Sequence, residues 1–441
     1  MNRWSSPTSG LFPPGVVNRD GFEDQRVACR LGILQLHRQV CFNRWIDKHV
    51  MPGNAILPKH HGTIITRGLQ EWACLLPLDL PFATVDRLLK WQTRSSEMIC
   101  ASEARRLVGA HGEAIRAAEA REVEELLAKE DLNGIKPALA PQTNRRYAAG
   151  WPEELTEAVA LALERGDAQP PEGVKGCDWE RVLTARAQEQ LSAQQLRKLG
   201  PEVKPDQVVA ATDDVLVRRP EKGRTLSIRT ARVATADGFR YLSGTGEAVL
   251  NQLLVLLILC GAHTKTVLLL GDGAKWIRNF FLQRMQGFAR KELILDWYHL
   301  KKKCYDFCSM ISKSKKAKAS LLGGLLTMLW QGRVEEAIAL LEASRPECRN
   351  EQRLDELIGY FAARQPYIPD YKARRADRLY IGSAHAEKAN DLIVARRQKH
   401  KGMHWSEKTA DGLAALKTLT LNRGWDPYWN DRKVLPLAAG A

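Results

Sequence analysis

Three acidic residues in the second half of the chain are spaced so that their carboxylates could act together. Asp213 lies in an apolar run, Asp272 lies in a Gly-Asp-Gly sequence after another apolar run, and Glu387 lies in a helical pattern. Carboxylates that converge from separate segments can hold two divalent ions, which activate an attacking oxygen and stabilise the leaving oxygen in phosphodiester chemistry. Hard oxygen ligands favour Mg²⁺ or Mn²⁺. These residue types therefore indicate a metal-dependent site that acts on a phosphodiester.

Each of the three residues also has a simpler explanation when it is taken alone. Asp213 is followed by Asp214, and adjacent strand residues face opposite sides of a sheet, so only one of them can point into a site. We favour Asp213, with Asp214 in a supporting position, and the reverse order stays open. Asp272 between two glycines also suits an ordinary turn, and an isolated Glu387 would be a solvated helix residue. The signal is the position of all three together.

The stretch 205–312 supplies secondary structure in an order that would bring these residues together. Short unbroken apolar runs at 266–270 and 293–295 are typical of buried parallel strands. The expected order is three strands, a helix, a strand, a helix, a strand and a helix, at 207–218, 224–235, 238–242, 247–261, 266–271, 274–285, 292–296 and from 298. This order predicts the first part of an RNase H-like α/β catalytic core, with a mixed five-stranded sheet and helices on both faces.

Three further segments follow this first part of the core. Residues 313–380 are predicted to form an all-helical insertion, in which 321–341 is one amphipathic helix. Residues 381–430 are predicted to hold the last helix of the core, at 384–399, and a C-terminal basic region. Residues 431–441 are predicted to be a tail.

The region before the core is predicted to be mainly helical and to bind DNA. Residues 1–25 are rich in Pro, Gly, Ser and Asn, and we expect them to be disordered. In the mainly helical region 26–200, the segment 82–110 fits a helix-turn-helix in which Arg105 and Arg106 would face DNA. A helical hairpin with solvated arginines fits the same pattern, and both interpretations stay open.

The composition favours a polyanionic partner. The 66 Lys and Arg residues outnumber the 51 Asp and Glu residues, and the resulting net charge of +15 suggests nucleic acid. Nine cysteines without a Cys-x-x-Cys pair argue against a disulfide framework and a structural zinc site. The N-terminus has no apolar signal segment, and the most apolar run, 249–262, is too short to span a bilayer, so we expect a cytoplasmic protein.

Four short blocks of the sequence resemble those of bacterial DDE transposases. They are GDGAKWI at 271–277, LDWYHLKKK at 295–303, IGSAHAEKAN at 381–390 and RRQKHKGMHWS at 396–406. Their order is most similar to that of the ISKra4 and ISLre2 insertion-sequence families, and more distantly to that of the IS256 and Mutator group. The resemblance extends over residues 208–430, with a weaker likeness at 60–110.

The resemblance implies a role for each residue of the candidate site. Asp213, Asp272 and Glu387 would form the catalytic triad and would hold two Mg²⁺ or Mn²⁺ ions. Asp296 and His299 would form the Asp-x-x-His element that supports the site, with His299 holding DNA or the scissile phosphate. A histidine packed on the sheet edge at the start of a helix is the alternative for His299.

The resemblance also implies an activity and a partner. The protein would be a DNA transposase that binds the terminal inverted repeats of its insertion sequence and catalyses 3′-end cleavage and strand transfer. Its partner would be double-stranded DNA, bound as a homodimer or higher oligomer in the bacterial cytoplasm at the nucleoid. A structure-specific nuclease on the same fold and a catalytically defective, transposase-derived DNA-binding protein are the alternatives.

A set of basic and aromatic residues is predicted to contact this DNA. Most contacts of this kind neutralise phosphates and position the duplex without reading its sequence. Trp405 could stack on a base, or belong to the core. The predicted contacts are Arg105, Arg106, Lys301, Lys302, Lys303, Arg396, Arg397, Lys399, His400, Lys401 and Trp405.

Overall fold

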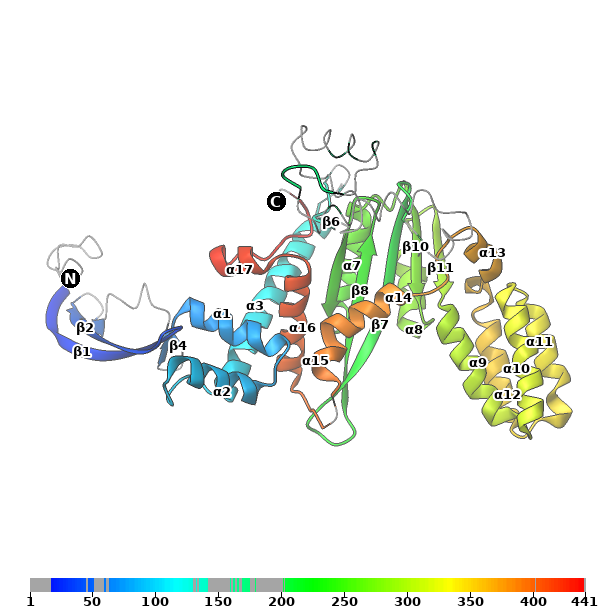
Figure 1. Ribbon diagram of the computed structural model, residues 1–441, viewed down its shortest axis with the longest axis horizontal. Coiled ribbons are helices and arrows are strands. Elements are labelled where there is room, and N and C mark those ends of the chain that lie inside the picture. The colour runs from blue at the N-terminus through cyan, green and yellow to red at the C-terminus, as the bar shows by residue number, and fades with distance from the viewer. Residues whose placement is uncertain are drawn as a thin grey trace.

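A central β-sheet lies between a helical region on one side and a group of short helices on the other (Figure 1). The computed structural model describes residues 17–44, 47–50, 59–60, 63–129, 132, 135–141, 159, 162, 165, 169–174, 179, 201, 203–400 and 402–439. The predicted disorder of residues 1–16 and the predicted DNA contact of Lys401 lie outside these residues.

The central sheet is mixed, with strands in the order β11-β10-β7-β8-β9 and the two-residue β6 beyond β9. β7, β8 and β9 pair antiparallel, whereas β10 pairs in parallel with both β7 and β11. The predicted mixed five-stranded sheet of an α/β core is confirmed. The strands are β6 (Ala140–Pro141), β7 (Gln207–Arg218), β8 (Thr225–Ala234), β9 (Gly238–Gly244), β10 (Thr266–Gly271) and β11 (Lys291–Leu295).

Helices cover both faces of this sheet because its central strands are apolar on both sides. On β10, Val267 and Leu269 pack in the core that contains α7 (Ala248–Leu259). The alternate residues Leu268 and Leu270 pack in the core that contains α9 (Trp297–Ile311). Period-two alternation sends successive side chains to opposite faces. No helix in the described part of the chain is both long enough and apolar enough to cross a bilayer.

Short helices beyond α9 extend the second of these cores, as the sequence pattern predicts. The single helix predicted at 321–341 is two helices instead. Gly332, with a φ of +71°, turns the chain between them, and a side chain there would lie 2.9 Å from the backbone nitrogen of Asp370. The four helices are α10 (Lys315–Trp330), α11 (Val334–Ala343), α12 (Glu351–Ala362) and α13 (Tyr371–Ala376).

The helix predicted at 384–399 is present but is not regular. It begins as α14 (Ala384–Asn390), widens to a π-helix at Asp391–Ala395, and ends as α15 (Arg396–Gln398). The helix α8 (Lys275–Asn279) also runs into a π-helix, at Phe280–Arg284. π-helical turns are rare and often occur at functional sites.

The N-terminal region contains a β-sheet that the sequence analysis did not predict. The strands β1 (Val17–Cys29) and β2 (Gly32–Asn43) form a long hairpin that projects from the rest of the molecule (Figure 1). The predicted disorder of residues 17–25 is therefore wrong. Much of the hairpin is exposed, so its strands lack the apolar alternation that would reveal them. The sheet is completed by β3 (Lys48–Val50), β4 (Lys59–His60) and β5 (Thr63–Ile65).

Three helices follow this sheet, and two of them correspond to the pair predicted at 82–110. They are α1 (Arg67–Leu75), α2 (Phe82–Thr93) and α3 (Ala101–Leu127). The connection at 94–100 is longer than the three- or four-residue turn of a helix-turn-helix, and α3 continues without a break to Leu127, beyond the segment 82–110. The helical pair is present, but its proportions differ from those predicted.

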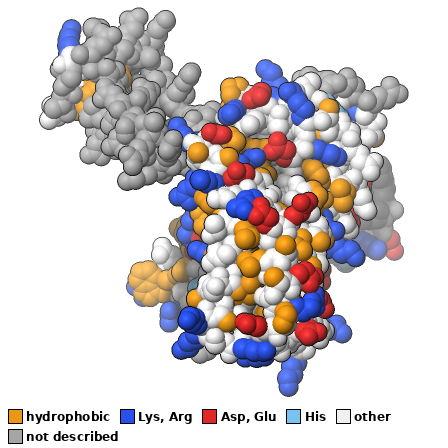
Figure 2. Space-filling view, turned by 90° about the vertical axis from the view of Figure 1, so that its right-hand side faces the viewer, with side chains coloured by type: hydrophobic (Ala, Val, Ile, Leu, Met, Phe, Trp, Pro, Cys, Tyr) orange, Lys and Arg blue, Asp and Glu red, His pale blue; other side chains and the backbone are white. Residues whose placement is uncertain are grey.

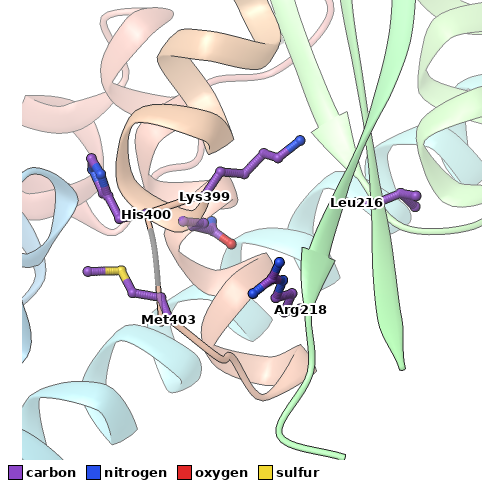
Figure 3. A pocket seen from close by; sticks show the side chains of 6 residues that line it. Leu216, Arg218, Lys399, His400 and Met403 are labelled. Atoms are coloured by element: carbon purple, nitrogen blue, oxygen red, sulfur yellow. The ribbon is translucent and has the colours of Figure 1, made fainter. Parts of the chain in front are cut away.

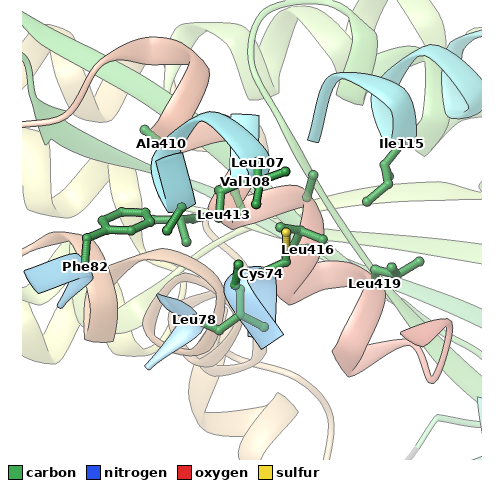
Figure 4. Packing of buried hydrophobic residues seen from close by; sticks show 14 of the residues in the cluster. Cys74, Leu78, Phe82, Leu107, Val108, Ile115, Ala410, Leu413, Leu416 and Leu419 are labelled. Atoms are coloured by element: carbon green, nitrogen blue, oxygen red, sulfur yellow. The ribbon is translucent and has the colours of Figure 1, made fainter. Parts of the chain in front are cut away.

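The helix α3 packs closely against α16 (Glu407–Leu421) through glycines. A side chain at Gly112 would overlap the Cα atom of Gly412, and one at Gly412 would lie 2.7 Å from the Val108 carbonyl oxygen. Apolar side chains from α1, α2, α3 and α16 surround this crossing (Figure 4). The N-terminal helices and the C-terminal part of the chain therefore share one core.

The segment after α17 (Trp425–Asp431) is also docked, although the sequence pattern predicts a tail there. Arg240 of β9 donates hydrogen bonds to the carbonyl oxygens of Leu435 and Pro436, at 2.7 and 2.5 Å. Glu122 of α3 accepts a hydrogen bond from the backbone N–H of Leu437 at 2.5 Å. These bonds hold the C-terminal segment against the edge of the sheet.

Candidate active site

Asp213 and Asp272 lie at the same level on neighbouring parallel strands. β7 and β10 pair so that Ala211 lies opposite Leu270. Asp213 and Asp272 each follow two residues later, where adjacent strands are about 4.8 Å apart. Residues two apart along a strand share a face, so both carboxylates leave the sheet on the face covered by α9 and α14. The two carboxylates that the sequence predicts to act together are thus brought together.

The carboxylate of Asp213 is held from two directions. The side-chain amide of Asn390 donates to its Oδ2 at 2.7 Å, and the backbone N–H of Asp214 donates to its Oδ1 at 2.8 Å. Burial raises the pKa of Asp213 to about 6, and the charge of Asp272 adds to this increase. The hydrogen bond from Asp214 opposes it. The carboxylate of Asp214 instead accepts a hydrogen bond from Ser227 Oγ at 2.6 Å. Asp213 is therefore the member of the pair that faces Asp272.

Asp272 is positioned by the turn that ends β10. Its Oδ1 accepts a hydrogen bond from the backbone N–H of Ala274 at 2.8 Å. Gly273 has a φ of +77°, a conformation that favours glycine, and a side chain there would lie 2.7 Å from Leu295 Cδ1. A side chain at Gly271 would lie 2.7 Å from Ile277 Cδ1. The backbone conformation thus favours glycine at 273, whereas a side chain at 271 would require Ile277 to shift, in agreement with the turn chemistry considered from the sequence.

Asp296 is a fully buried carboxylate that links two helices. It caps α9 by accepting the backbone N–H of His299 at 2.9 Å, and it also accepts the backbone N–H and the hydroxyl of Ser383. Burial would raise the pKa of Asp296, but the hydrogen bonds from His299 and Ser383 outweigh burial and hold it at about 2. Asp296 is thus an ionised structural anchor between the start of α9 and the start of α14.

His299 lies between this anchor and the two strand carboxylates. Its Nδ1 is 3.3 Å from Asp296 Oδ1, an ion-pair distance outside good hydrogen-bond geometry. The Asp296 carboxylate raises the pKa of His299 to about 8, although burial opposes this increase. The charges of Asp213 and Asp272 contribute to the same increase. His299 is therefore cationic at neutral pH beside two carboxylates.

The helix α14 crosses the strand ends from Asp296 to Asp213. Ser383, just before the helix, contacts Asp296, whereas Asn390 at its end contacts Asp213. Glu387 lies between them, and the spacing of four and then three residues puts all three on one helical face. Glu387 is exposed on that face. Among the described residues, Glu387 does not join Asp213 and Asp272 in a group of three side chains that could hold a metal ion, so the structure brings together two of the three predicted acids.

The oxygen ligands available here fit a small hard cation. Asp213 and Asp272 are both carboxylates and repel each other, and a divalent cation would offset that repulsion. Mg²⁺ commonly uses only one or two carboxylates and fills its remaining positions with water and substrate phosphate. In the described part of the chain, no three His, Cys, Asp or Glu side chains are already gathered as a metal site.

Asn390 and Ser383 contact the acidic residues of the candidate site and were not predicted from the sequence. Asn390 also accepts a hydrogen bond from Thr230 Oγ1 at 2.6 Å, so its amide is oriented from β8 while it donates to Asp213. Neither residue type is distinctive in a sequence. The available signal was their spacing around Glu387, at four residues before and three after.

Two predicted DNA contacts are not supported, because their side chains are buried. Arg397 is 6% exposed, and its Nε donates to the Pro77 carbonyl oxygen at 2.7 Å. Trp405 is 7% exposed, and its Nε1 donates to the Gln398 carbonyl oxygen at 3.0 Å. The Arg397 guanidinium lies 4.7 Å from the centre of the Trp405 ring, so the pair packs internally. A basic residue type alone could not distinguish this role from a surface role.

Other predicted contacts remain at the surface. Lys399 and His400 line a cavity of about 310 Å³ together with Arg218 at the end of β7, and Figure 3 shows these side chains around it. Arg396 is exposed and pairs with Asp391 at 2.8 Å. Leu216, Gln398 and Met403 complete the lining of the cavity. This surface brings together cations from two segments that are distant in the sequence.

The remaining predicted DNA contacts differ in the exposure of their side chains and in whether they are paired with an acidic residue. Lys301 and Lys302 are exposed on α9, whereas Lys303 is half-buried and lies 4.6 Å from the centre of the Phe307 ring. Arg105 is exposed on α3, and Arg106 pairs with Glu103 of the same helix. Lys301, Lys302 and Arg105 are thus the members of this group with the most exposed side chains.

A scan of the sequence against models of protein families gave no match, and neither did a search of curated proteins. The function of this site is therefore inferred from the residues and their arrangement.

Proposed function

We propose that the protein is a DDE-type DNA transposase with an RNase H-like catalytic core. The observation that carries the proposal is the level placement of Asp213 and Asp272 at neighbouring parallel strands, beside the helix α14 that supplies Asn390 to Asp213 and also contains Glu387. The strand order, with three antiparallel strands followed by two parallel ones, supports the fold assignment. The sequence blocks that resemble bacterial insertion-sequence transposases contain Asp272, Asp296, His299 and Glu387.

Asp213, Asp272 and Glu387 would hold Mg²⁺ or Mn²⁺. When bound, these ions would supply charge stabilisation to the attacking and leaving oxygens of a phosphodiester. Asn390 fixes the orientation of the Asp213 carboxylate, and the Gly-Asp-Gly turn fixes that of Asp272. The cationic His299 favours binding of a phosphate beside these carboxylates.

The DNA partner is favoured by the net charge of +15 and by the exposed cations near the site. Lys301 and Lys302 on α9, and Lys399 and His400 beyond α14, extend from the two helices that cover the strand ends. They would neutralise phosphates of double-stranded DNA. Joining two ends of one element requires two active sites, so the functional unit would be a homodimer or larger.

The outer face of α10, α11 and α12 is a less favourable surface for DNA. Figure 2 shows basic, acidic and apolar side chains intermixed on this end of the molecule. Several of its arginines are paired locally, including Arg333 with Glu336 and Arg353 with Glu356. A surface whose charges are mutually neutralised offers little attraction for a polyanion. The DNA path is therefore proposed along the strand ends.

A strand-transfer assay tests the proposal. Labelled DNA ends, taken from the sequences that flank the gene for this chain, are incubated with the protein, a target plasmid and Mg²⁺. We expect joined products from the parent protein and none from Asp272→Ala. The matched control is Asp206→Ala, which removes an exposed carboxylate from the opposite end of β7 and should leave joining unchanged.

The same assay separates the alternatives. Cleavage without joining would indicate a structure-specific nuclease, and DNA binding without either reaction would indicate a catalytically defective DNA-binding protein. If the Asp272→Ala protein joined ends as well as the parent, the assigned site would be wrong.

A further inference from the structure

Two arginines near the Gly-Asp-Gly turn have buried nitrogen atoms that lack hydrogen-bond partners. Arg364 follows α12, and its Nη2 donates to the Gly273 carbonyl oxygen at 3.0 Å. Its Cζ lies 3.9 Å from the centre of the Tyr360 ring. Among the described residues, none accepts a hydrogen bond from its buried Nε. Arg278 of α8 also has a buried Nε without a described acceptor.

Such donors are costly when they stay unsatisfied. A buried donor without a partner costs about 1–3 kcal/mol, and more when it belongs to a charged group. Burial lowers the pKa of Arg364, and the charge of Arg278 lowers it further, so the two cations are close enough to repel each other. An anion placed between them would satisfy both donors and cancel the repulsion.

The nearby carboxylate of Asp272 raises the pKa of Arg364 but does not satisfy the buried Nε atoms. In the described part of the chain, no ion pair joins Asp272 to either arginine, and its Oδ1 is occupied by the backbone N–H of Ala274. The arrangement around Gly273 keeps Arg364 beside the turn, since a side chain at Gly273 would lie 3.0 Å from Arg364 Nε. The guanidinium therefore has a fixed place next to the proposed metal ligand, with donors left for another group.

We infer that Arg278 and Arg364 form a phosphate-binding site beside Asp272, and that its ligand is a phosphodiester of the DNA strand in the active site. The inference rests on the proposed function. Planar guanidinium groups bind phosphate oxygens in pairs, which fixes the position of the phosphate as well as neutralising it. Arg364 comes from the helices between α9 and α14, so this segment supplies an inner wall of the active site.

A simpler role for Arg364 is to hold the Gly273 turn and nothing more. The two roles differ in a measurable way, because each neutralised phosphate contributes about 0.9 to the slope of log affinity against log salt concentration for duplex DNA. A residue that only supports the turn would leave this slope unchanged. The slope therefore reports phosphate contact independently of cleavage.

The test is fluorescence anisotropy of a labelled, mixed-sequence DNA duplex across a range of salt concentrations, with the full chain. We expect Arg364→Gln and Arg278→Gln each to lower the salt slope by about 1. Arg364→Lys, which keeps the charge but loses the fork, should lower affinity with a smaller change in slope. The matched control is Arg353→Gln on α12, where Arg353 is paired with Glu356, and its slope should equal that of the parent.

A second arm uses duplexes in which single phosphates are replaced by neutral methylphosphonates. At one position the replacement should weaken binding by the parent but not by Arg364→Gln. If Arg364→Gln does not fold, as judged by circular dichroism, Arg278→Gln and Arg364→Lys decide the question. Parental slopes in folded Arg278 and Arg364 variants would overturn the inference, as would a parent chain that binds no duplex DNA.

The phosphate site and the proposed function can fail separately. Lowered slopes in a protein that neither cleaves nor joins DNA would support the phosphate site and reject the transposase activity. Unchanged slopes in a protein that joins ends would do the reverse.

Discussion

The Asp213→Asn variant is expected to unfold less readily than the parent protein at pH 8 when divalent ions are absent. Burial raises the pKa of Asp213 from 3.8 to about 6, so the folded state holds this proton more tightly than the unfolded state does. The parent therefore loses stability as the pH rises from about 4 to about 6, and the loss persists above that range. Asparagine has no charge to bury, so the variant avoids this loss.

The size of the effect follows from the same structure. A pKa difference of about two pH units corresponds to about 3 kcal/mol, at 1.36 kcal/mol per unit. The single amide oxygen of asparagine cannot replace both carboxylate oxygens, which accept from Asp214 and Asn390, so about 1 kcal/mol of hydrogen bonding is lost. The net gain in free energy of unfolding is about 1–2 kcal/mol at pH 8. At pH 4 only the loss of about 1 kcal/mol remains.

Urea unfolding with a chelator, at both pH values, measures this difference. A repeat with Mg²⁺ should stabilise the parent by binding to the folded state and should stabilise the variant much less. The control is Asp214→Asn, in which Asp213 and Asp272 stay together. Because the charge of Asp214 contributes least to the raised pKa of Asp213, this variant should gain less at pH 8 than Asp213→Asn and should respond normally to Mg²⁺.

Two results would refute the reasoning. Lower stability of Asp213→Asn at pH 8 would show that the buried charge is not a burden in the folded protein. Equal stabilisation of the parent and Asp213→Asn by Mg²⁺ would show that the carboxylate is not part of a metal site.

Three further predictions concern the surroundings of the site. Gly273→Ala should lower the melting temperature more than Gly223→Ala does. Both glycines have a φ near +76°, but only a side chain at position 273 would meet neighbouring atoms. Equal decreases in melting temperature would contradict this. Asp296→Asn should lower the pKa of His299 from about 8 towards 6.5, as followed by NMR, and an unchanged value would exclude Asp296 as the cause. Gly412→Ala should destabilise the protein by about 1–3 kcal/mol in urea unfolding, whereas a neutral effect would argue against the close crossing of α3 and α16.

The core of the fold was predictable because its signals are local. The strands at 207–218 and 266–271 have the predicted bounds, since unbroken β-rich runs between turn residues leave little ambiguity. The β1–β2 hairpin was not predicted, because strands exposed on much of their surface carry no apolar alternation. The helix at 384–399 widens into a π-helix at Asp391–Ala395. The position of this widening depends on packing, which a single sequence does not display.

The candidate site was predictable in its acidic residues but not in their partners. Asp213 and Asp272 stand out because acidic residues within or directly after apolar strands are unusual. The contacts of Ser383, Asn390 and Arg364 depend on chain segments far from these strands, which no local pattern connects. Arg397 was wrongly predicted to contact DNA because it lies in a basic segment. Its guanidinium is buried instead, against the Trp405 ring and the Pro77 carbonyl oxygen.

The docking of the C-terminal segment has a consequence for how the protein is made. Arg240 and Glu122 gain their partners only after Leu435, Pro436 and Leu437 have been synthesised, 195 or more residues later. A chain still on the ribosome has the strands of the sheet but lacks these contacts and the packing of α16 against α3. Long-range contacts of this kind form late and slow folding. Assembly of the proposed active site is thereby coupled to synthesis of the segment that contains α16 and residues 435–437.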